Sequence, residues 1–199
     1  GETLHPLPTR ENKKPKLSSV YALSKYDQER LCLITGKAYN IPTTALRFFN
    51  VYGTRQALSN PYTGVLAIFA SRLLNNNPPM IFEDGKQKRD FIHVKDVARA
   101  CVLALENPKA EGEVFNIGSG NQYTITQIAN KLAKVMNMDI APEITGKYRV
   151  GDIRHCFADM TKTEKILGFK PEVEFEDGLF ELAQWLKGQI ATDNVSKAS

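Results

Sequence analysis

Short apolar runs that suit buried strands alternate along this sequence with longer segments of helical periodicity. The apolar runs lie at 44–49, 80–82, 91–94 and 114–118, and the helical segments at 20–39, 65–74, 96–106, 125–136, 160–167 and 178–190. Alternating strands and helices of this kind usually build a mainly parallel sheet covered by helices. The sequence therefore predicts an α/β fold.

Residues with known capping preferences support several of these helix boundaries. Ser18 or Ser19 can cap the helix that begins at about residue 20. Thr124 and Gln127 have the spacing of a capping box. Gly168 follows the segment 160–167, as is typical of a helix C-terminus. Residues 50–61 are rich in Gly, Ser, Asn and Pro, and we expect them to form a loop.

Composition argues against several classes of protein. Hydrophobic residues make up 42% and charged residues 24% of the chain, as is ordinary for a globular protein. No apolar run reaches the roughly 18 residues of a membrane span. The net charge of +4 is small and scattered, which does not favour nucleic acid. Three widely spaced cysteines fit neither a disulfide framework nor a zinc site. We therefore expect no membrane, nucleic acid or metal partner, and a reducing, cytoplasmic setting.

Tyr21 and Lys25 stand one turn apart in the first predicted helix, so their side chains face the same side of it. A lysine ammonium beside a phenol favours the phenolate and lowers the tyrosine pKa from its usual value near 10. Such a tyrosine can act as a general acid or base near neutral pH. On spacing alone, a solvent-exposed pair on a surface helix is the plainer interpretation.

A series of motifs follows this pair along the chain. They are IPTTALRFFNVYG at 41–53, RDFIHVKDVA at 89–98, FNIGSG at 115–120, RVGD at 149–152 and LGFKP at 167–171. Together with Tyr21 and Lys25, the series resembles the extended short-chain dehydrogenase/reductase family, and within it the nucleotide-sugar 4-epimerases and 4,6-dehydratases. The resemblance covers nearly the whole chain. It implies the C-terminal part of a Rossmann-type fold with a small mixed α/β substrate-binding lobe.

The resemblance implies NAD as the cofactor and gives roles to residues near the reacting sugar. Tyr21 matches the catalytic tyrosine, which takes a proton from a sugar hydroxyl. Lys25 matches the lysine that lowers the pKa of that tyrosine and binds the nicotinamide ribose. Phe49 lies where family members contact NAD through the backbone. The implied reaction is 4-epimerisation through a 4-keto intermediate; a 4,6-dehydratase and a truncated nucleotide-sugar-binding module without catalysis remain alternatives.

The resemblance also implies a binding site for a UDP- or dTDP-sugar. The matching positions are Asn50, Gly64, Val65, Met80, Ile81, Phe82, Arg89, Arg149, Asp152 and Cys156. Asn50, Arg89 and Arg149 correspond to residues that hold the diphosphate, and Asp152 to an acid that binds the ribose of the nucleotide. Residues 80–82 correspond to the edge strand against which the base packs. Gly64 and Val65 fall in a segment that lines the nucleotide.

Two arginines suit a diphosphate, because planar guanidinium groups can donate two hydrogen bonds at once to phosphate oxygens. They converge only if the fold brings positions 89 and 149 together. Ion pairs are the alternative roles: Arg89 with Asp90 or Asp96, and Arg149 with Asp152. 

Cys156 matches a position where a bulky residue closes the hexose pocket and excludes N-acetyl groups in family members. The small cysteine side chain therefore predicts a site that admits larger sugars. The alternative is a buried small hydrophobic residue with no role in selectivity.

The sequence contains no Gly-x-Gly-x-x-Gly or Gly-x-x-Gly-x-x-Gly loop; the nearest match is at 118–120. In the family, that loop binds the NAD pyrophosphate and precedes the catalytic tyrosine. The resemblance thus implies that most of the NAD site lies on a missing N-terminal segment, in the same polypeptide or on a separate chain. It also implies that this portion alone is inactive.

The same resemblance divides the chain into three parts and implies a homodimer. Residues 1–60 would form the end of the Rossmann domain with the Tyr–Lys helix. Residues 61–190 would form mainly the substrate-binding lobe, with Rossmann elements interleaved between 91 and 118. Residues 191–199 would form a flexible tail.

Overall fold

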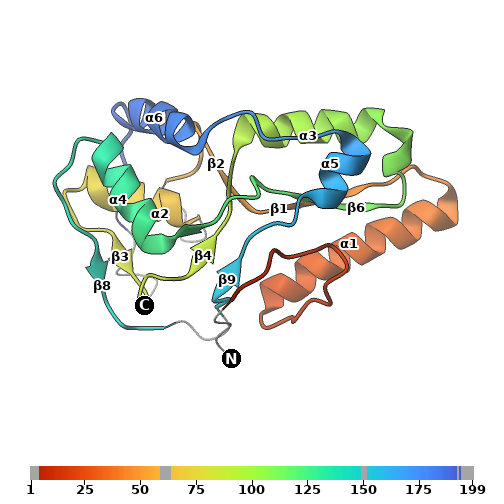
Figure 1. Cartoon of the computed structure of the whole chain (residues 1–199), viewed down its shortest axis with the longest axis horizontal. Helices are drawn as coiled ribbons and strands as arrows, with labels where there is room; N and C mark the ends of the chain where they lie inside the picture. The colour runs from red at the N-terminus through yellow and green to blue at the C-terminus, as the bar shows by residue number, and fades with distance from the viewer. Residues whose placement is uncertain (1–4, 59–63, 149–151, 192, 194–199) are drawn as a thin grey trace.

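A computed structural model describes residues 5–58, 64–148, 152–191 and 193 of the 199-residue chain. It confirms the predicted α/β class, because short and mostly parallel strand pairs lie among helices (Figure 1). Two hydrophobic cores hold these elements together, one on each side of the molecule.

The first core forms around strands β1 (Ala45–Phe48) and β6 (Val114–Ile117), which pair in parallel. Helices α3 (Val94–Glu106) and α5 (Thr161–Leu167) lie on one side of this pair, and α1 (Val20–Tyr39) lies on the other (Figure 1). The short 3-10 helix η1 (Pro108–Ala110) leads into β6. Fully or almost fully buried side chains fill this core: Ile92, Ala100, Phe115, Ile117 and Phe169.

The second core forms where helices α2 (Val65–Leu74), α4 (Ile125–Val135) and α6 (Phe175–Leu186) pack together. Its central side chains are fully or almost fully buried: Leu66, Phe69, Leu73, Ile128, Leu132, Leu179, Leu182 and Leu186. These residues recur at helical spacing on each helix, so each helix turns one apolar stripe inward.

Three further small sheets complete the fold. Strand β2 (Asn50–Tyr52) pairs in parallel with β5 (Phe91–His93), and β3 (Met80–Ile81) pairs in parallel with β8 (Glu143–Ile144). Strand β4 (Lys88–Arg89) lies between β7 (Tyr123–Thr124), which is antiparallel to it, and β9 (His155–Cys156), which is parallel.

The predicted helix ends are confirmed where a cap is present. The Ser19 hydroxyl accepts a hydrogen bond from the Ala22 N–H at 3.1 Å at the start of α1. Thr124 and Gln127 form the predicted capping box of α4. Gly168 ends α5 with a φ of 66°, a left-handed conformation that glycine adopts without steric cost.

Other boundaries were predicted wrongly. Residues 50–52 form β2 instead of loop, α3 begins at Val94 rather than at residue 96, and α6 occupies Phe175–Leu186 rather than 178–190. Strands β4, β7, β8 and β9 were not predicted, because two residues carry no periodicity and their pairing partners are distant in sequence.

Helix α1 stands apart from both cores. Gly36 is its buried residue, and an added Cβ at that position would lie 2.2 Å from the Thr43 hydroxyl oxygen. Glu29 pairs with Arg47 of β1 through two hydrogen bonds of 2.7 and 2.8 Å, which ties the helix to the strand. Among the described residues, no helix combines the length and the apolar character needed to cross a membrane.

Candidate functional site

The sheet of β7, β4 and β9 brings together three of the residues that the sequence assigned to the substrate. Arg89 and Cys156 are Cα partners in the β4–β9 pair. The Arg89 guanidinium donates from Nη2 to Asp152 Oδ1 at 3.1 Å, so the predicted diphosphate ligand and the predicted ribose ligand form an ion pair. Arg89 is mostly buried and Asp152 is partly exposed, with 15% and 39% of their side chains accessible.

The backbone that precedes β9 holds the rest of the Arg89 guanidinium. Nη2 donates to the carbonyl oxygen of Ile153 at 2.6 Å, and Nη1 donates to that of Arg154 at 3.0 Å. Asp152 is held in turn, because its Oδ1 also accepts from the Ile153 N–H at 2.8 Å. The position of Arg89 therefore depends on the path of residues 152–154.

The ion pairs suggested for Arg89 with Asp90 or Asp96 are wrong. Asp90 is fully buried, and its carboxylate accepts from the N–H groups of Ser119, Gly120 and Ala158. Asp96 is also buried and accepts from two backbone N–H groups before α6, besides pairing with Arg99. Arg149 lies outside the described residues, so its role as a diphosphate ligand stays a prediction.

Tyr21 and Lys25 lie together on α1, on the same side of the helix, as their spacing predicts. Lys25 Nζ lies 5.8 Å from the centroid of the Tyr21 ring and donates to Gln28 Oε1 at 3.3 Å. The Tyr21 side chain is accessible, with 72% of the residue exposed. Within the described residues, no hydrogen bond or ion pair joins these two side chains to Arg89 or Asp152.

Phe49 and Asn50 lie at the carboxyl end of β1. The Phe49 N–H donates to the Ile117 carbonyl oxygen at 3.0 Å. The backbone group of Phe49 that could contact NAD is therefore the Phe49 carbonyl oxygen. Asn50 donates from both its N–H and its Nδ2 to the carbonyl oxygen of Asp90, at 3.1 and 2.8 Å. The Asn50 side chain thus holds β2 against the segment before β5.

The residues assigned to the nucleotide base lie at β3 and just after it. Met80 and Ile81 pair with Glu143 and Ile144 of β8, and Ile81 is fully buried. Phe82 is half-buried at the start of the turn that follows. The two further nucleotide-lining residues lie elsewhere, at the start of helix α2: Gly64 and Val65.

The half-buried Cys156 side chain lies beside Arg89. Burial raises the pKa of its thiol, which keeps the thiol protonated at neutral pH. Cys156 is therefore suited to shape a pocket rather than to act as a nucleophile.

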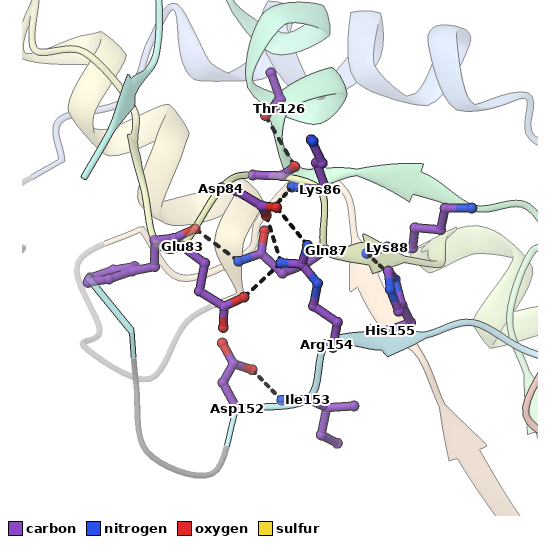
Figure 2. Close-up of polar contacts among 12 residues, drawn as sticks. Glu83, Asp84, Lys86, Gln87, Lys88, Thr126, Asp152, Ile153, Arg154 and His155 are labelled. Carbon is purple, nitrogen blue, oxygen red and sulfur yellow. Dashed lines mark hydrogen bonds and ion pairs between the residues drawn. The ribbon is translucent and has the colours of Figure 1, made fainter. Parts of the chain in front are cut away.

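One charged cluster at this sheet was not found by sequence reasoning. Figure 2 shows the Arg154 side chain directed at Glu83 and Asp84, in the turn between β3 and β4. Arg154 donates from Nη1 to Glu83 at 2.8 Å and to Asp84 at 2.6 Å, and from Nη2 to the other Asp84 oxygen at 2.7 Å. These bonds hold the pKa of Asp84 well below its usual range and raise that of Arg154. The only signal in the sequence was the position of Arg154 directly after Asp152 and Ile153.

Comparisons with known proteins agree with the motif series. The model of the NAD dependent epimerase/dehydratase family matches residues 2–118. The chain is 34% identical to a dTDP-L-rhamnose 4-epimerase of Burkholderia thailandensis, over 94% of this chain and 52% of that protein. It is 35% identical to a putative UDP-glucose 4-epimerase of Methanocaldococcus jannaschii, over 94% of this chain and 59% of that protein.

A solved structure shares both the fold and the sequence pattern. The UDP-glucose 4-epimerase of Thermotoga maritima, determined with UDP-glucose, superposes with a TM-score of 0.84 at 37% identity, over 94% of this chain and 59% of that one. The chain therefore spans between about half and three fifths of the length of the relatives it matches.

Proposed function

Since the chain belongs to the NAD dependent epimerase/dehydratase family, we propose that it carries the catalytic helix and the substrate-binding lobe of a nucleotide-sugar 4-epimerase. The observation that carries this proposal is the grouping of Arg89, Asp152 and Cys156 at the β4–β9 pair. A relative named as a 4-epimerase and one named as a putative 4-epimerase are 34 and 35% identical to this chain, which supports the epimerase type.

The proposed substrate is a UDP- or dTDP-sugar held mainly by its nucleotide part. Arg89, together with Arg149, would bind the diphosphate, and Asp152 would accept a hydrogen bond from a ribose hydroxyl. The Arg89–Asp152 bond orients both side chains before the substrate arrives, which lowers the entropic cost of binding. Residues 80–82 would pack against the base.

Tyr21 is the proposed acid and base. It would take the proton from the C4 hydroxyl, while the positive charge of Lys25 favours the phenolate that results. The described residues fit the nicotinamide end of NAD. Tyr21 and Lys25 are accessible on one side of α1, and Phe49 directly follows the carboxyl end of the parallel strand β1, where dinucleotides bind. NAD would supply the acceptor and donor of the hydride.

Oxidation at C4 would leave a 4-keto sugar. This sugar must rotate so that the hydride returns to its other face, and Tyr21 then returns the proton to O4. The diphosphate would stay bound to the arginines during that rotation, so the intermediate is retained. Binding energy from a part of the substrate that does not react would thus hold the reacting part in place.

The whole reaction belongs to a longer protein in the relatives, of which the chain covers only part. The printed sequence holds no glycine-rich loop for the NAD pyrophosphate. For these 199 residues alone we therefore propose binding of the nucleotide-sugar without turnover.

Titration calorimetry of this chain with UDP and with dTDP tests the proposal. We expect one of the two nucleotides to bind, and Arg89→Ala to weaken that binding about 10-fold or more, because a charged donor to the diphosphate is lost. Arg10→Ala is the matched control, since it removes an Arg–Asp pair of 3.0 Å that involves neither predicted ligand. Absence of heat with both nucleotides at millimolar concentration would refute the proposed function.

A further inference from the structure

Arg154 lies next to the proposed diphosphate and ribose ligands but has no role in the function proposed so far. We propose that Arg154, Glu83 and Asp84 form a latch that positions Arg89 and Asp152 for binding of a nucleoside diphosphate. Arg154 is then a positioning residue that acts through Arg89 and does not touch the substrate. This inference rests on the proposed function and deepens it.

The charges of the latch argue against Arg154 as a direct phosphate ligand. All the oxygens that the Arg154 side chain donates to belong to carboxylates, those of Glu83 and Asp84. The Arg89 guanidinium instead faces one carboxylate, that of Asp152, and three backbone carbonyl oxygens. Two carboxylates face one guanidinium, so the cluster carries a net negative charge and would repel an anion. The side chains of Arg154, Glu83 and Asp84 are 21, 29 and 46% accessible, so solvent screens the pair with Glu83 less than the pair with Asp84.

The backbone of Arg154 connects the latch to Arg89. Its carbonyl oxygen accepts from Arg89 Nη1, and the carbonyl oxygen of the preceding residue, Ile153, accepts from Nη2. Pairing of β9 with β4 begins only at His155. The Arg154 side chain is therefore the anchor that fixes residues 152–154 just before the strand, where Arg89 and Asp152 meet.

The turn that receives Arg154 is itself closely fixed. Glu83 has a φ of 55°, and its N–H donates to the Lys147 carbonyl oxygen at 2.7 Å. The Gly85 carbonyl oxygen accepts from both the N–H and the hydroxyl of Thr126, each at 3.1 Å. A Cβ at position 85 would lie 2.1 Å from that hydroxyl oxygen, and φ there is +73°, so glycine is required.

The turn also continues directly from β3, the strand proposed to contact the base. The latch thus links two parts of the proposed nucleotide site: the base edge at 80–82 and the diphosphate and ribose ligands at Arg89 and Asp152. Its expected contribution is to affinity for the nucleotide rather than to the chemistry at C4.

A double-mutant cycle on this chain tests the inference, with UDP or dTDP as the probe, whichever binds the wild type. We expect Arg154→Ala to raise the dissociation constant about 10-fold, and Arg10→Ala to leave it within about 2-fold. In the Arg89→Ala background, Arg154→Ala should have little further effect, because the residue through which it acts is gone. Arg154→Lys should restore part of the affinity, since a lysine can pair with one carboxylate at a time.

The outcomes separate the inference from the proposed function. No binding of either nucleotide to the wild type overturns both. Wild-type affinity in Arg154→Ala overturns the latch alone, and so does an effect of equal size with and without Arg89, which would indicate a general loss of structure. If Arg154→Ala does not fold, as judged by far-UV circular dichroism, Asp84→Asn replaces it in the same cycle with the same criteria, because it keeps the shape of the side chain.

Discussion

Cys156 lies opposite Arg89 across the β4–β9 pair, half-buried and held protonated by the burial that raises its thiol pKa. A cysteine in this place contributes little volume and no charge. Its neighbours Arg89 and Asp152 are proposed to hold the nucleotide, so the space beside Cys156 is where the sugar would follow. We therefore expect side-chain size at this one position to decide which substituents on the sugar fit.

For Cys156→Tyr we expect a loss of affinity that is confined to N-acetylated sugars. The larger ring should raise the dissociation constant of UDP-N-acetylglucosamine about 10-fold relative to that of UDP-glucose, while the affinity for UDP stays the same. Calorimetry with the three ligands measures this, with Cys156→Ser as the size-matched control. An unchanged ratio between the two sugars in Cys156→Tyr would show that this side chain does not shape the hexose pocket.

At the scale of the elements, His93 joins strand β5 to helix α3. His93 ends β5 and is the N-cap of α3, where its Nδ1 accepts from the Lys95 N–H at 3.4 Å. Nδ1 acts as an acceptor, so the neutral ring carries its hydrogen on Nε2, which is buried and has no hydrogen-bond partner within the described residues. The structure thus gives a hydrogen-bond partner to one of the two ring nitrogens of His93.

We expect His93 to make the protein less stable in mild acid. Burial, and to a lesser degree Lys95, lowers the pKa of His93, whereas Glu181 and Asp96 raise it more weakly than burial lowers it. The unfolded chain then binds a proton near pH 6.5 that the folded chain still rejects. The free energy of unfolding should therefore be unaffected by His93 above about pH 6.5 and should decrease as the pH falls below that value.

Urea unfolding between pH 8 and pH 5 checks this for the wild type and for His93→Asn, which keeps a capping acceptor but does not titrate. The wild type should lose more stability over this range than the variant. Parallel curves for the two proteins would rule out His93 as the source of the pH dependence.

Helix α1 presents a largely apolar stripe that the described part of the chain leaves exposed. Its apolar residues are exposed, at 84, 46, 67 and 58%: Val20, Leu23, Leu31 and Ile34. At 3.6 residues per turn these four share one face with the exposed Asp27, and the buried Gly36 lies on the opposite face, against β1. Figure 1 shows the helix lying along the outside of the molecule. We expect an exposed stripe of this kind to be an interaction surface.

We expect this stripe to form the homodimer implied by the family resemblance. Sedimentation velocity at micromolar concentration should give the mass of a dimer for the wild type and of a monomer for Leu31→Lys, which places a charge in the stripe without lowering helix propensity. Leu105→Lys is the control, because Leu105 is an exposed leucine on a different helix, α3, and is 87% accessible. A monomeric wild type, or dimers of all three proteins, would contradict the assignment.

The sequence by itself determined the α/β class, the bounds of α1 and α2, and the caps of α1, α4 and α5. It did so because helical periodicity and capping preferences are local and act over a few neighbouring residues. Its motif series also led to the family. Each short motif alone could occur in many proteins, but the whole series in this order is specific.

Only the tertiary structure decided which charges meet. Asp152 rather than Asp90 or Asp96 is the partner of Arg89, and Arg154 reaches a turn some 70 positions earlier in the chain. Strands of two residues, β4 and β9, set both pairings, and such strands leave no pattern in the sequence. Opposite charges are abundant along any chain, so which of them pair depends on the path of the backbone through space.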